Sequence, residues 1–199
     1  MTNIPSILRK DKKLSKIIDN NKLVDDSPEY NVFHALVKSV TGQQLSVKAA
    51  ASIYQRFLGR YDGVPPEPQE LLATGIEELR SLGYSYRKAG YLHNIATYFV
   101  DNPEQPWDQW SDDEIIDSLT QIKGVGKWTV QMVLMFTLLR PDVFPIDDLG
   151  VQNAMKEIYD LSEDKKEMKL QMVDIAEKWK PHRTVASRYM WASLNNEPC

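Results

Sequence analysis

The amino-acid sequence predicts an all-α fold, and three observations support that class. Apolar residues recur at helical spacing along most of the chain, whereas runs that alternate β-branched and polar residues are nearly absent. No Asn-Gly pair marks a β-hairpin. The composition, 42% hydrophobic and 26% charged over 199 residues, is ordinary for a globular protein and excludes a disordered chain. We therefore expect roughly ten helices, arranged as one large domain or two small lobes.

Two helices are expected in the first third of the chain. The tripeptide Ser27-Pro28-Glu29 offers an N-cap, a proline at the first helical position and an acid in the first turn. The apolar stripe of that helix consists of Val32, Phe33, Leu36, Val37 and Val40. A second helix is expected to start near Leu45 or Ser46 and to run through Leu58, with alanines that allow close packing.

Turn-forming residues separate the next two helices. Residues 59–68 read GRYDGVPPEP, which predicts a loop. A helix is expected over residues 85–100, and the segment Asn102–Pro106 breaks it. The sequence Ser111-Asp112-Asp113-Glu114 has the capping-box pattern, with glutamate at the third helical position. The stripe behind it, which we expect to be buried, consists of Ile115, Ile116, Leu119 and Ile122.

The last third of the chain predicts four more helices. A core helix is expected from Lys127 to Pro141, because residues 128–139 are the most apolar stretch of the chain. That stretch is too short to span a bilayer. Further helices are expected over about 148–159, after an N-cap at Ser162, and over about 182–193.

The net charge of −4, with a pI of about 5.5, at first argues against nucleic acid as a partner. The charge is uneven, however. Residues 101–118 hold seven acids and no lysine or arginine, whereas residues 121–140 hold Lys123, Lys127 and Arg140 and no acid. We expect a locally basic groove on an acidic body, and few phosphate contacts there would give modest non-specific affinity for DNA. Further basic residues that could extend the groove are Arg87, Lys88, Lys180, Arg183 and Arg188.

Cysteine and histidine usage excludes several kinds of site. The single cysteine, Cys199, allows no internal disulfide framework and no Cys-based zinc or iron–sulfur centre. The histidines His34, His93 and His182 show no metal-ligand spacing, so we expect no catalytic metal. No signal peptide or membrane segment is visible, which predicts a soluble, cytoplasmic protein without a membrane partner.

The most specific motif is Gly124-Val125-Gly126 between two expected helices. Two glycines in a tight turn leave backbone N–H groups open at the start of the second helix, which is a ready site for an anion such as a DNA phosphate. Lys123 and Lys127 flank the turn. A plain connection between two antiparallel helices would also use such glycines, so the turn alone does not decide its role.

The context of the turn adds a resemblance to a known family. The segment Phe144-Pro145-Ile146-Asp147-Asp148-Leu149-Gly150-Val151 follows the core helix. Hairpin, core helix and a Pro-Asp crossover into a helix resemble the helix-hairpin-helix (HhH-GPD) DNA glycosylase superfamily, in particular its alkylation-repair branch, DNA-3-methyladenine glycosylase II. The other matching stretches are residues 40–50 (VTGQQLSVKAA), 82–89 (LGYSYRKA) and 179–187 (WKPHRTVAS).

The resemblance implies how the chain is organised. It predicts a single glycosylase domain over residues 1–199, made of two helical lobes with the active-site cleft between them. One lobe would comprise roughly residues 32–145, and the other residues 1–31 together with 146–199. The extra N-terminal β-domain of some bacterial members is expected to be missing.

The resemblance also assigns the reaction. Asp148 occupies the place of the family's catalytic acid, whereas a capping or supporting role is expected for Asp147. Alkylation makes a purine cationic and a good leaving group, so one carboxylate that stabilises the oxocarbenium-like sugar and orients water suffices. Trp128 stands where lyase relatives such as endonuclease III carry a Schiff-base lysine, and Lys127 lies about 100° around the helix. A monofunctional glycosylase is therefore expected.

Pocket and DNA-contact residues carry over position by position. Trp128 would offer its face to the cationic base, although a core tryptophan is the alternative. The other expected pocket residues are Met132, Leu149 and His182, and a fold-supporting His182 is equally consistent with the sequence. Gln44 falls at the wedge position, where some members have leucine, and both Gln43 and Gln44 could instead form a polar helix start. The hairpin contacts to DNA are expected from Lys123, Gly124, Val125, Gly126, Lys127 and Thr129.

Cofactor and partner expectations follow from the same family. No cofactor is expected, apart from a structural Na⁺ or K⁺ held by the main-chain carbonyls of Thr120, Ile122 and Val125. The expected partner is double-stranded DNA containing alkylated bases, bound by a monomer, in the nucleoid of a bacterium or the nucleus of a eukaryote. Two alternatives remain: a glycosylase for deaminated or oxidised bases on the same scaffold, and a non-catalytic helix-hairpin-helix DNA-binding module.

Overall fold

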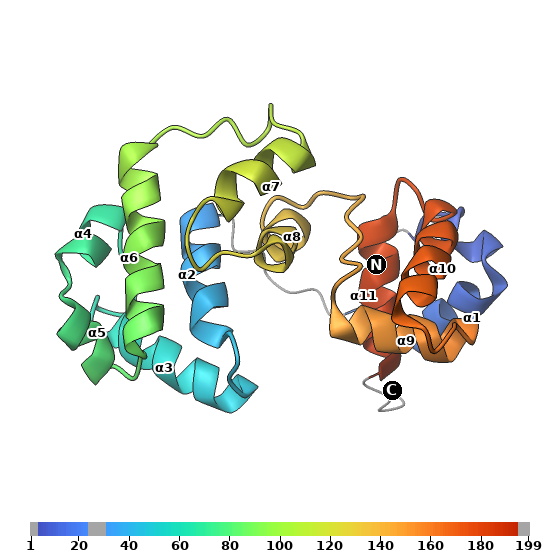
Figure 1. Ribbon diagram of the computed structural model, residues 1–199, viewed down its shortest axis with the longest axis horizontal. Coiled ribbons are helices and arrows are strands. Elements are labelled where there is room, and N and C mark those ends of the chain that lie inside the picture. Colours follow the sequence, from blue (N-terminus) through green and yellow to red (C-terminus); the bar gives the residue numbers. More distant parts are fainter. Residues whose placement is uncertain (1–3, 24–30, 195–199) are drawn as a thin grey trace. The chain divides into compact units, whose positions relative to one another are not determined.

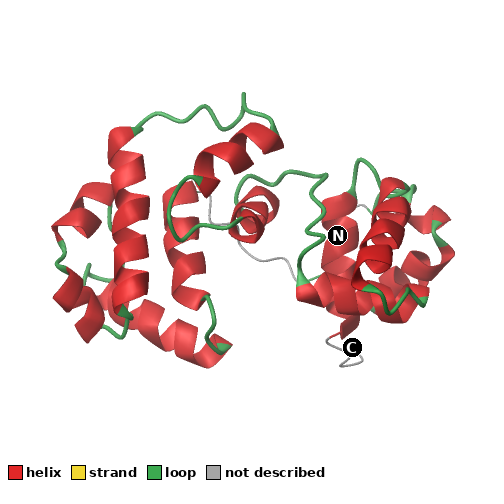
Figure 2. Ribbon diagram, viewed as in Figure 1, coloured by secondary structure: helices red, strands yellow, loops and turns green. Residues whose placement is uncertain are grey.

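The computed structural model of the chain describes residues 4–23 and 31–194. Within those residues the protein is entirely helical, with eleven α-helices, one short 3₁₀-helix and no strand (Figure 1, Figure 2). The all-α prediction is therefore confirmed. The chain divides into two compact units: a central unit, Pro28–Leu138, and a terminal unit, which combines Met1–Ser27 with Leu139–Cys199.

The central unit is built around one long helix, α6. This helix packs against α2 and α4, and α8 packs against α2 and α7. The apolar stripe expected from the sequence in α2 lies in the core, together with Leu92 and Ile95 of α6. The helices of this unit are α2 (Val32–Gly42), α3 (Val47–Gly59), α4 (Pro68–Ala73), α5 (Ile76–Ser81), α6 (Tyr86–Asp101), α7 (Asp112–Thr120) and α8 (Lys127–Phe136).

The terminal unit joins the two ends of the chain around a core of its own. Helix α11 packs against both α9 and α1, and Trp179 is fully buried among them. The methionines Met155, Met172 and Met190 fill much of the same core. The helices are η1 (Leu8–Lys10), α1 (Lys12–Asn20), α9 (Leu149–Tyr159), α10 (Lys165–Glu177) and α11 (Arg183–Leu194).

Several helix starts follow the sequence prediction, because capping depends on neighbouring residues alone. Ser46 caps α3, and Ser85 caps α6. Ser111 and Glu114 form the expected capping box at α7, in which each side chain accepts a hydrogen bond from the other residue's backbone N–H. The expected start at Ser27-Pro28-Glu29 lies outside the described residues, and the described helix α2 begins at Val32 with Asn31 as its N-cap.

Other expectations were wrong. Asp164, and not Ser162, caps α10. The Ser162 hydroxyl instead accepts a hydrogen bond from the backbone N–H of Asp164, the residue before the helix, at 3.2 Å. The core helix α8 ends at Phe136, with Thr137 as its C-cap, well before Pro141, and the chain then adopts a left-handed conformation at Leu139 (φ 53°). The short helices α4 and α5, and helix α1, had not been predicted.

A single carboxylate fastens the N-terminal segment to the rest of the terminal unit. Oδ1 of Asp11 caps α1 by accepting hydrogen bonds from the backbone of Lys13 and Leu14. Oδ2 accepts from the Tyr159 hydroxyl at 2.7 Å and from the indole of buried Trp179 at 3.1 Å. Burial on its own would raise the pKa of Asp11, but these hydrogen bonds outweigh it and hold the pKa below its ordinary value.

Replacing Asp11 with asparagine is expected to lower the free energy of unfolding at pH 7 by about 1–3 kcal/mol. The single oxygen of the amide can serve either the two backbone N–H groups or Tyr159 and Trp179, so one of these two sets of donors loses its acceptor. A carboxylate with a depressed folded-state pKa stabilises the protein above the unfolded pKa, near 3.9, and loses that effect as the pH falls through the folded value. The advantage of wild type over Asp11→Asn should therefore shrink below about pH 4. Urea unfolding over a pH series measures it.

The matched control is Asp19→Asn, which removes an exposed carboxylate of the same helix that pairs with Arg9. A surface ion pair of this kind contributes about 0.2–1 kcal/mol. An Asp11→Asn protein no less stable at pH 7 than Asp19→Asn would show that the hydrogen bonds of Asp11 do not hold the segment.

Candidate functional site

The acid singled out by the sequence lies at the N-terminus of α9. Asp148 is the N-cap of this helix, and its Oδ1 accepts a hydrogen bond from the backbone N–H of Val151 at 2.8 Å. The same oxygen accepts a second hydrogen bond, from Nε1 of Trp191 on α11, at 2.7 Å. The helix N-terminus favours negative charge at this place. The carboxylate is thus half-buried and held in position from two helices.

Gly150 makes the contact between Asp148 and Trp191 sterically feasible. A Cβ atom at this position would lie 2.9 Å from Cδ1 of Trp191 and 3.1 Å from Oδ1 of Asp148. Both distances are too short for an ordinary contact. Nothing in the sequence pointed to Trp191, because it lies 43 residues from Asp148 and no spacing rule connects the two. Gly150, two residues after the acid, permits the contact but does not identify Trp191 in the sequence.

The neighbouring acid has a different environment. Asp147 is exposed and forms an ion pair with Lys169 of α10. Asp148 is the residue that caps the helix and meets an indole. The two adjacent carboxylates are therefore chemically distinct, and they form a natural pair for comparing a candidate catalytic group with its neighbour.

The crossover that leads to Asp148 is fixed to α11. Arg183 donates two hydrogen bonds to the carboxylate of Asp142, at 2.8 and 2.9 Å. The Thr184 hydroxyl donates to the carbonyl of Arg140 at 2.6 Å and accepts from the backbone of Val143 at 3.0 Å. This bidentate, part-buried pair and the threonine bridge determine the path of the chain before α9 begins.

The glycine turn forms the connection between α7 and α8. Gly124 has a φ of 109°, and a Cβ atom there would lie 2.3 Å from Cγ of Tyr91. The position therefore requires glycine both for its conformation and for the close approach of the tyrosine ring. Gly126 is the N-cap of α8 and has no side chain to cap it. Lys123 and Lys127 on either side are exposed, whereas Val125 is buried.

Two side-chain amides hold this turn from neighbouring elements. Nε2 of Gln43 donates to the carbonyl of Gly124 at 3.2 Å. Nδ2 of Asn94, on α6, donates to the carbonyl of Lys123 at 3.0 Å. The turn is therefore attached to both the end of α2 and the middle of α6. The sequence had suggested Gln43 only as a DNA-contacting residue or a polar helix start, and it had not singled out Asn94.

Helix α6 also supports the segment that contains Gln44. Gln44 is exposed and adopts a left-handed conformation with a φ of 57°. Nη2 of Arg87 donates to Oε1 of Gln44 at 3.3 Å, and Nζ of Lys88 donates to the carbonyl of Thr41 at 2.8 Å. Burial, and to a smaller extent the charge of Arg87, lowers the pKa of Lys88. Residues 87, 88, 91 and 94 lie on one side of a helix, so a single face of α6 contacts both turns.

The remaining predicted residues differ in exposure. Trp128 is 42% exposed, which does not fit the alternative of a core tryptophan. Thr129, in contrast, is buried, so its side chain is not presented at the surface. Met132 is half-buried one turn along α8 from Trp128, and Leu149 is 69% exposed directly after Asp148. His182 is half-buried just before α11, where its backbone N–H donates to the carbonyl of Trp179.

No group of three or more histidine, cysteine, aspartate or glutamate side chains is placed to hold a metal ion among residues 4–23 and 31–194. The carbonyls of Thr120, Ile122 and Val125 belong to the end of α7 and the turn after it. The Ile122 carbonyl accepts a hydrogen bond from the backbone N–H of Val125 at 2.9 Å. Within the same described ranges, no helix is long and apolar enough to cross a membrane.

Comparison with known proteins finds relatives over most of the chain. A family model described as "HhH-GPD superfamily base excision DNA repair protein" matches residues 37–181. The chain is 34% identical over 184 residues to DNA-3-methyladenine glycosylase 1 of Schizosaccharomyces pombe. The aligned region covers 90% of this chain and 80% of the relative.

Solved structures agree with this comparison. The S. pombe 3-methyladenine DNA glycosylase in complex with abasic DNA matches with a TM-score of 0.79 and 33% identity, over 92% of this chain and 90% of the other. A DNA-3-methyladenine glycosidase from Bacillus halodurans matches with a TM-score of 0.84 and 30% identity, over 98% and 90% of the two chains.

Substituting Gly124 with alanine is expected to lower the free energy of unfolding by about 2 kcal/mol or more, because the new methyl group collides with Tyr91 in a conformation that favours glycine. Gly126→Ala is the control, since a Cβ atom there meets nothing within 4 Å and its φ is −99°. It should cost less than about 1 kcal/mol. Thermal and urea unfolding compare the two, and equal stabilities would contradict the packing described for the turn.

Proposed function

We infer the function of this chain from its family: it belongs to the HhH-GPD superfamily of base excision DNA repair proteins. We propose that it is a monofunctional DNA glycosylase that flips alkylated purines, of the 3-methyladenine and 7-methylguanine type, out of double-stranded DNA. It then hydrolyses their N-glycosidic bond and leaves an abasic site. It acts as a monomer on chromosomal DNA. The observation that carries this proposal is Asp148, which caps α9 within a chain that matches alkylpurine glycosylases over most of its length.

The chemistry needs one well-placed carboxylate. An alkylated purine already carries positive charge, so it leaves without protonation, and charge develops on the sugar as the bond breaks. In our proposal the Asp148 carboxylate stabilises that oxocarbenium-like state and orients the attacking water. The hydrogen bonds from Val151 and Trp191 to Oδ1 support this role, because they fix the carboxylate before substrate binds.

The residue at position 128 favours hydrolysis without strand cleavage. A lyase step requires an amine that attacks the sugar, and this position, where endonuclease III has a lysine, is tryptophan here. Lys127 is exposed, but it lies about 100° away around α8. The exposed indole of Trp128 instead suits a cation–π contact with the positively charged base. We propose Met132, Leu149 and His182 as further residues that contact the base.

DNA contacts are proposed for the two turns that α6 supports. The uncapped start of α8 and the flanking Lys123 and Lys127 would bind a backbone phosphate. A buried Thr129 would take part through its backbone N–H and not through its hydroxyl. Main-chain carbonyls of Thr120, Ile122 and Val125 would hold a structural monovalent cation, which would neutralise phosphate charge when bound.

The two glutamines have different proposed roles. Gln44 is exposed, and its backbone is held in the left-handed region, which suits a residue that enters the DNA minor groove. Gln43 donates to the hairpin carbonyl of Gly124 and so acts as a positioning residue for the hairpin. An amide at the wedge position could also pair with the base left without its partner.

Asp148→Asn is the sharpest test of the catalytic assignment. Asparagine is as good an N-cap as aspartate and can still accept hydrogen bonds through its Oδ1, so the fold should persist. Loss of the negative charge should slow single-turnover excision of methylated purines by at least about 100-fold, with DNA affinity within a few-fold of wild type.

Asp147→Asn is the matched control, because it removes the exposed adjacent carboxylate. Its excision rate should stay within about threefold of wild type. Near wild-type excision by Asp148→Asn would remove this residue from the mechanism. Duplex binding without release of any base by the wild-type protein would instead favour a non-catalytic DNA-binding module.

A further inference from the structure

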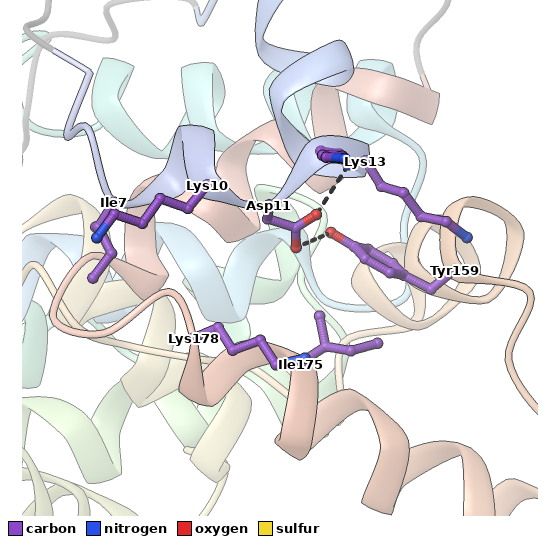
Figure 3. A pocket seen from close by; sticks show the side chains of 8 residues that line it. Ile7, Lys10, Asp11, Lys13, Tyr159, Ile175 and Lys178 are labelled. Atoms are coloured by element: carbon purple, nitrogen blue, oxygen red, sulfur yellow. Dashed lines mark hydrogen bonds between the residues drawn. The ribbon is translucent and has the colours of Figure 1, made fainter.

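The terminal unit contains a cavity that none of the sequence-predicted site residues lines. Its volume is about 530 Å³, which lies within the range of small-molecule sites (Figure 3). It opens between the start of α1, the end of α9 and the end of α10. Its lining includes Lys10, Lys12, Lys13 and Lys178, with the apolar surfaces of Tyr159 and Ile175.

The four lysines differ from other basic residues of the same unit. Arg9 pairs with Asp19, Lys156 with Glu163, and Lys180 with Glu177. Within residues 4–23 and 31–194, none of the four cavity lysines forms an ion pair. The side chains of Lys10 and Lys13 extend toward opposite sides of the cavity in Figure 3. Like charges around one cavity repel one another, and a bound anion would offset that repulsion.

The acidic and phenolic groups at the cavity do not balance this charge. Asp11 is the carboxylate in the lining, and Figure 3 shows its hydrogen bonds with the backbone of Lys13 and the hydroxyl of Tyr159. Its oxygens also accept from the backbone of Leu14 and from the indole of Trp179. Burial, together with the hydrogen bond to Asp11, raises the pKa of Tyr159 far above its ordinary value, so the phenol stays neutral. Nζ of Lys13 lies 5.4 Å from the centre of the Tyr159 ring. Among the residues that line the cavity, the four lysines and the Asp11 carboxylate leave a net charge of +3.

We propose that this cavity is a second, phosphate-binding site for nucleotides, separate from the site of base excision. Lysine ammonium groups bind phosphate as point charges with three donors each. The walls formed by Ile7, Ile175 and the Tyr159 ring suit the sugar and base that accompany the phosphate. The phosphate belongs either to the backbone of a DNA strand or to a free nucleoside triphosphate, and both present the same chemistry to the four lysines.

The test uses two full-length variants with the same change in net charge. The cavity variant is Lys10→Gln, Lys12→Gln, Lys13→Gln and Lys178→Gln. The control variant is Lys16→Gln, Lys22→Gln, Lys165→Gln and Lys166→Gln. Each of these four lysines is exposed in the terminal unit and does not line the cavity. All eight side chains are exposed, or line an open cavity, so both variants should fold, and thermal unfolding checks this. Neither set includes a residue proposed for base excision.

The first arm measures binding of undamaged duplex DNA over a range of salt concentrations. If strand phosphates occupy the cavity, the cavity variant should bind about tenfold or more weakly at low salt. The slope of log affinity against log salt should also fall by about 0.9 for each lost phosphate contact. The control variant should change affinity by less than about threefold, because non-contacting charges act only through the screened field.

The second arm measures binding of ATP and of inorganic triphosphate by calorimetry. If a free nucleotide occupies the cavity, wild type and control should bind ATP, and the cavity variant should not. Equal behaviour of the two variants in both arms would overturn the proposal. Neither arm measures base excision. The two arms therefore test the cavity even if the chain proves not to be a glycosylase, and a negative result for the cavity leaves the glycosylase proposal unchanged.

Discussion

The hydrogen bond between the indole of Trp191 and Oδ1 of Asp148 joins the two helices on which the candidate catalytic centre depends. It connects the start of α9 to α11 across 43 residues of sequence. Gly150 permits the close approach, and the pairing of Arg183 with Asp142 fixes the crossover to the same helix. The carboxylate therefore does not rely on a mobile loop for its position. A preorganised negative charge is what a reaction with a cationic transition state needs.

Electrostatic features of the chain are local, and the net charge hides them. The hairpin offers uncapped N–H groups between two exposed lysines, and the cavity of the terminal unit gathers four more. Seven of the 28 acids of the chain lie within residues 101–118, a segment without lysine or arginine. If the hairpin supplies most of the phosphate contacts, as we propose, an acidic body with few basic contacts limits how tightly undamaged DNA is held. Such a balance suits an enzyme that must leave undamaged DNA.

How much the sequence predicts depends on the range of the interaction. The helix starts near Ser46 and Ser85 and the capping box at Ser111 depend on residues within one turn, and they are confirmed. The prediction of an N-cap at Ser162 is wrong because Asp164, two residues later, is an equally good N-cap residue and takes that place. Helices α4 and α5 have six residues each, too few for a repeating apolar stripe to show.

Contacts between distant residues were beyond the reach of sequence patterns. The approach of Gln43 to Gly124 spans 81 residues, and that of Asn94 to Lys123 spans 29. Sequence patterns also do not single out the basic stretch at residues 9–16, because its lysines line a cavity only when α9 and α10 fold against it. Family resemblance pointed to Asp148, whereas its contact with Trp191 became visible only in three dimensions.

The most direct measurement incubates the wild-type chain with methylated duplex DNA. Released bases are identified by mass spectrometry, and strand integrity is scored before and after alkali. We predict free 3-methyladenine and 7-methylguanine, with strands that stay intact until alkali is added. Release of only deaminated or oxidised bases from matched duplexes, or strand cleavage before alkali, would contradict a monofunctional alkylpurine glycosylase.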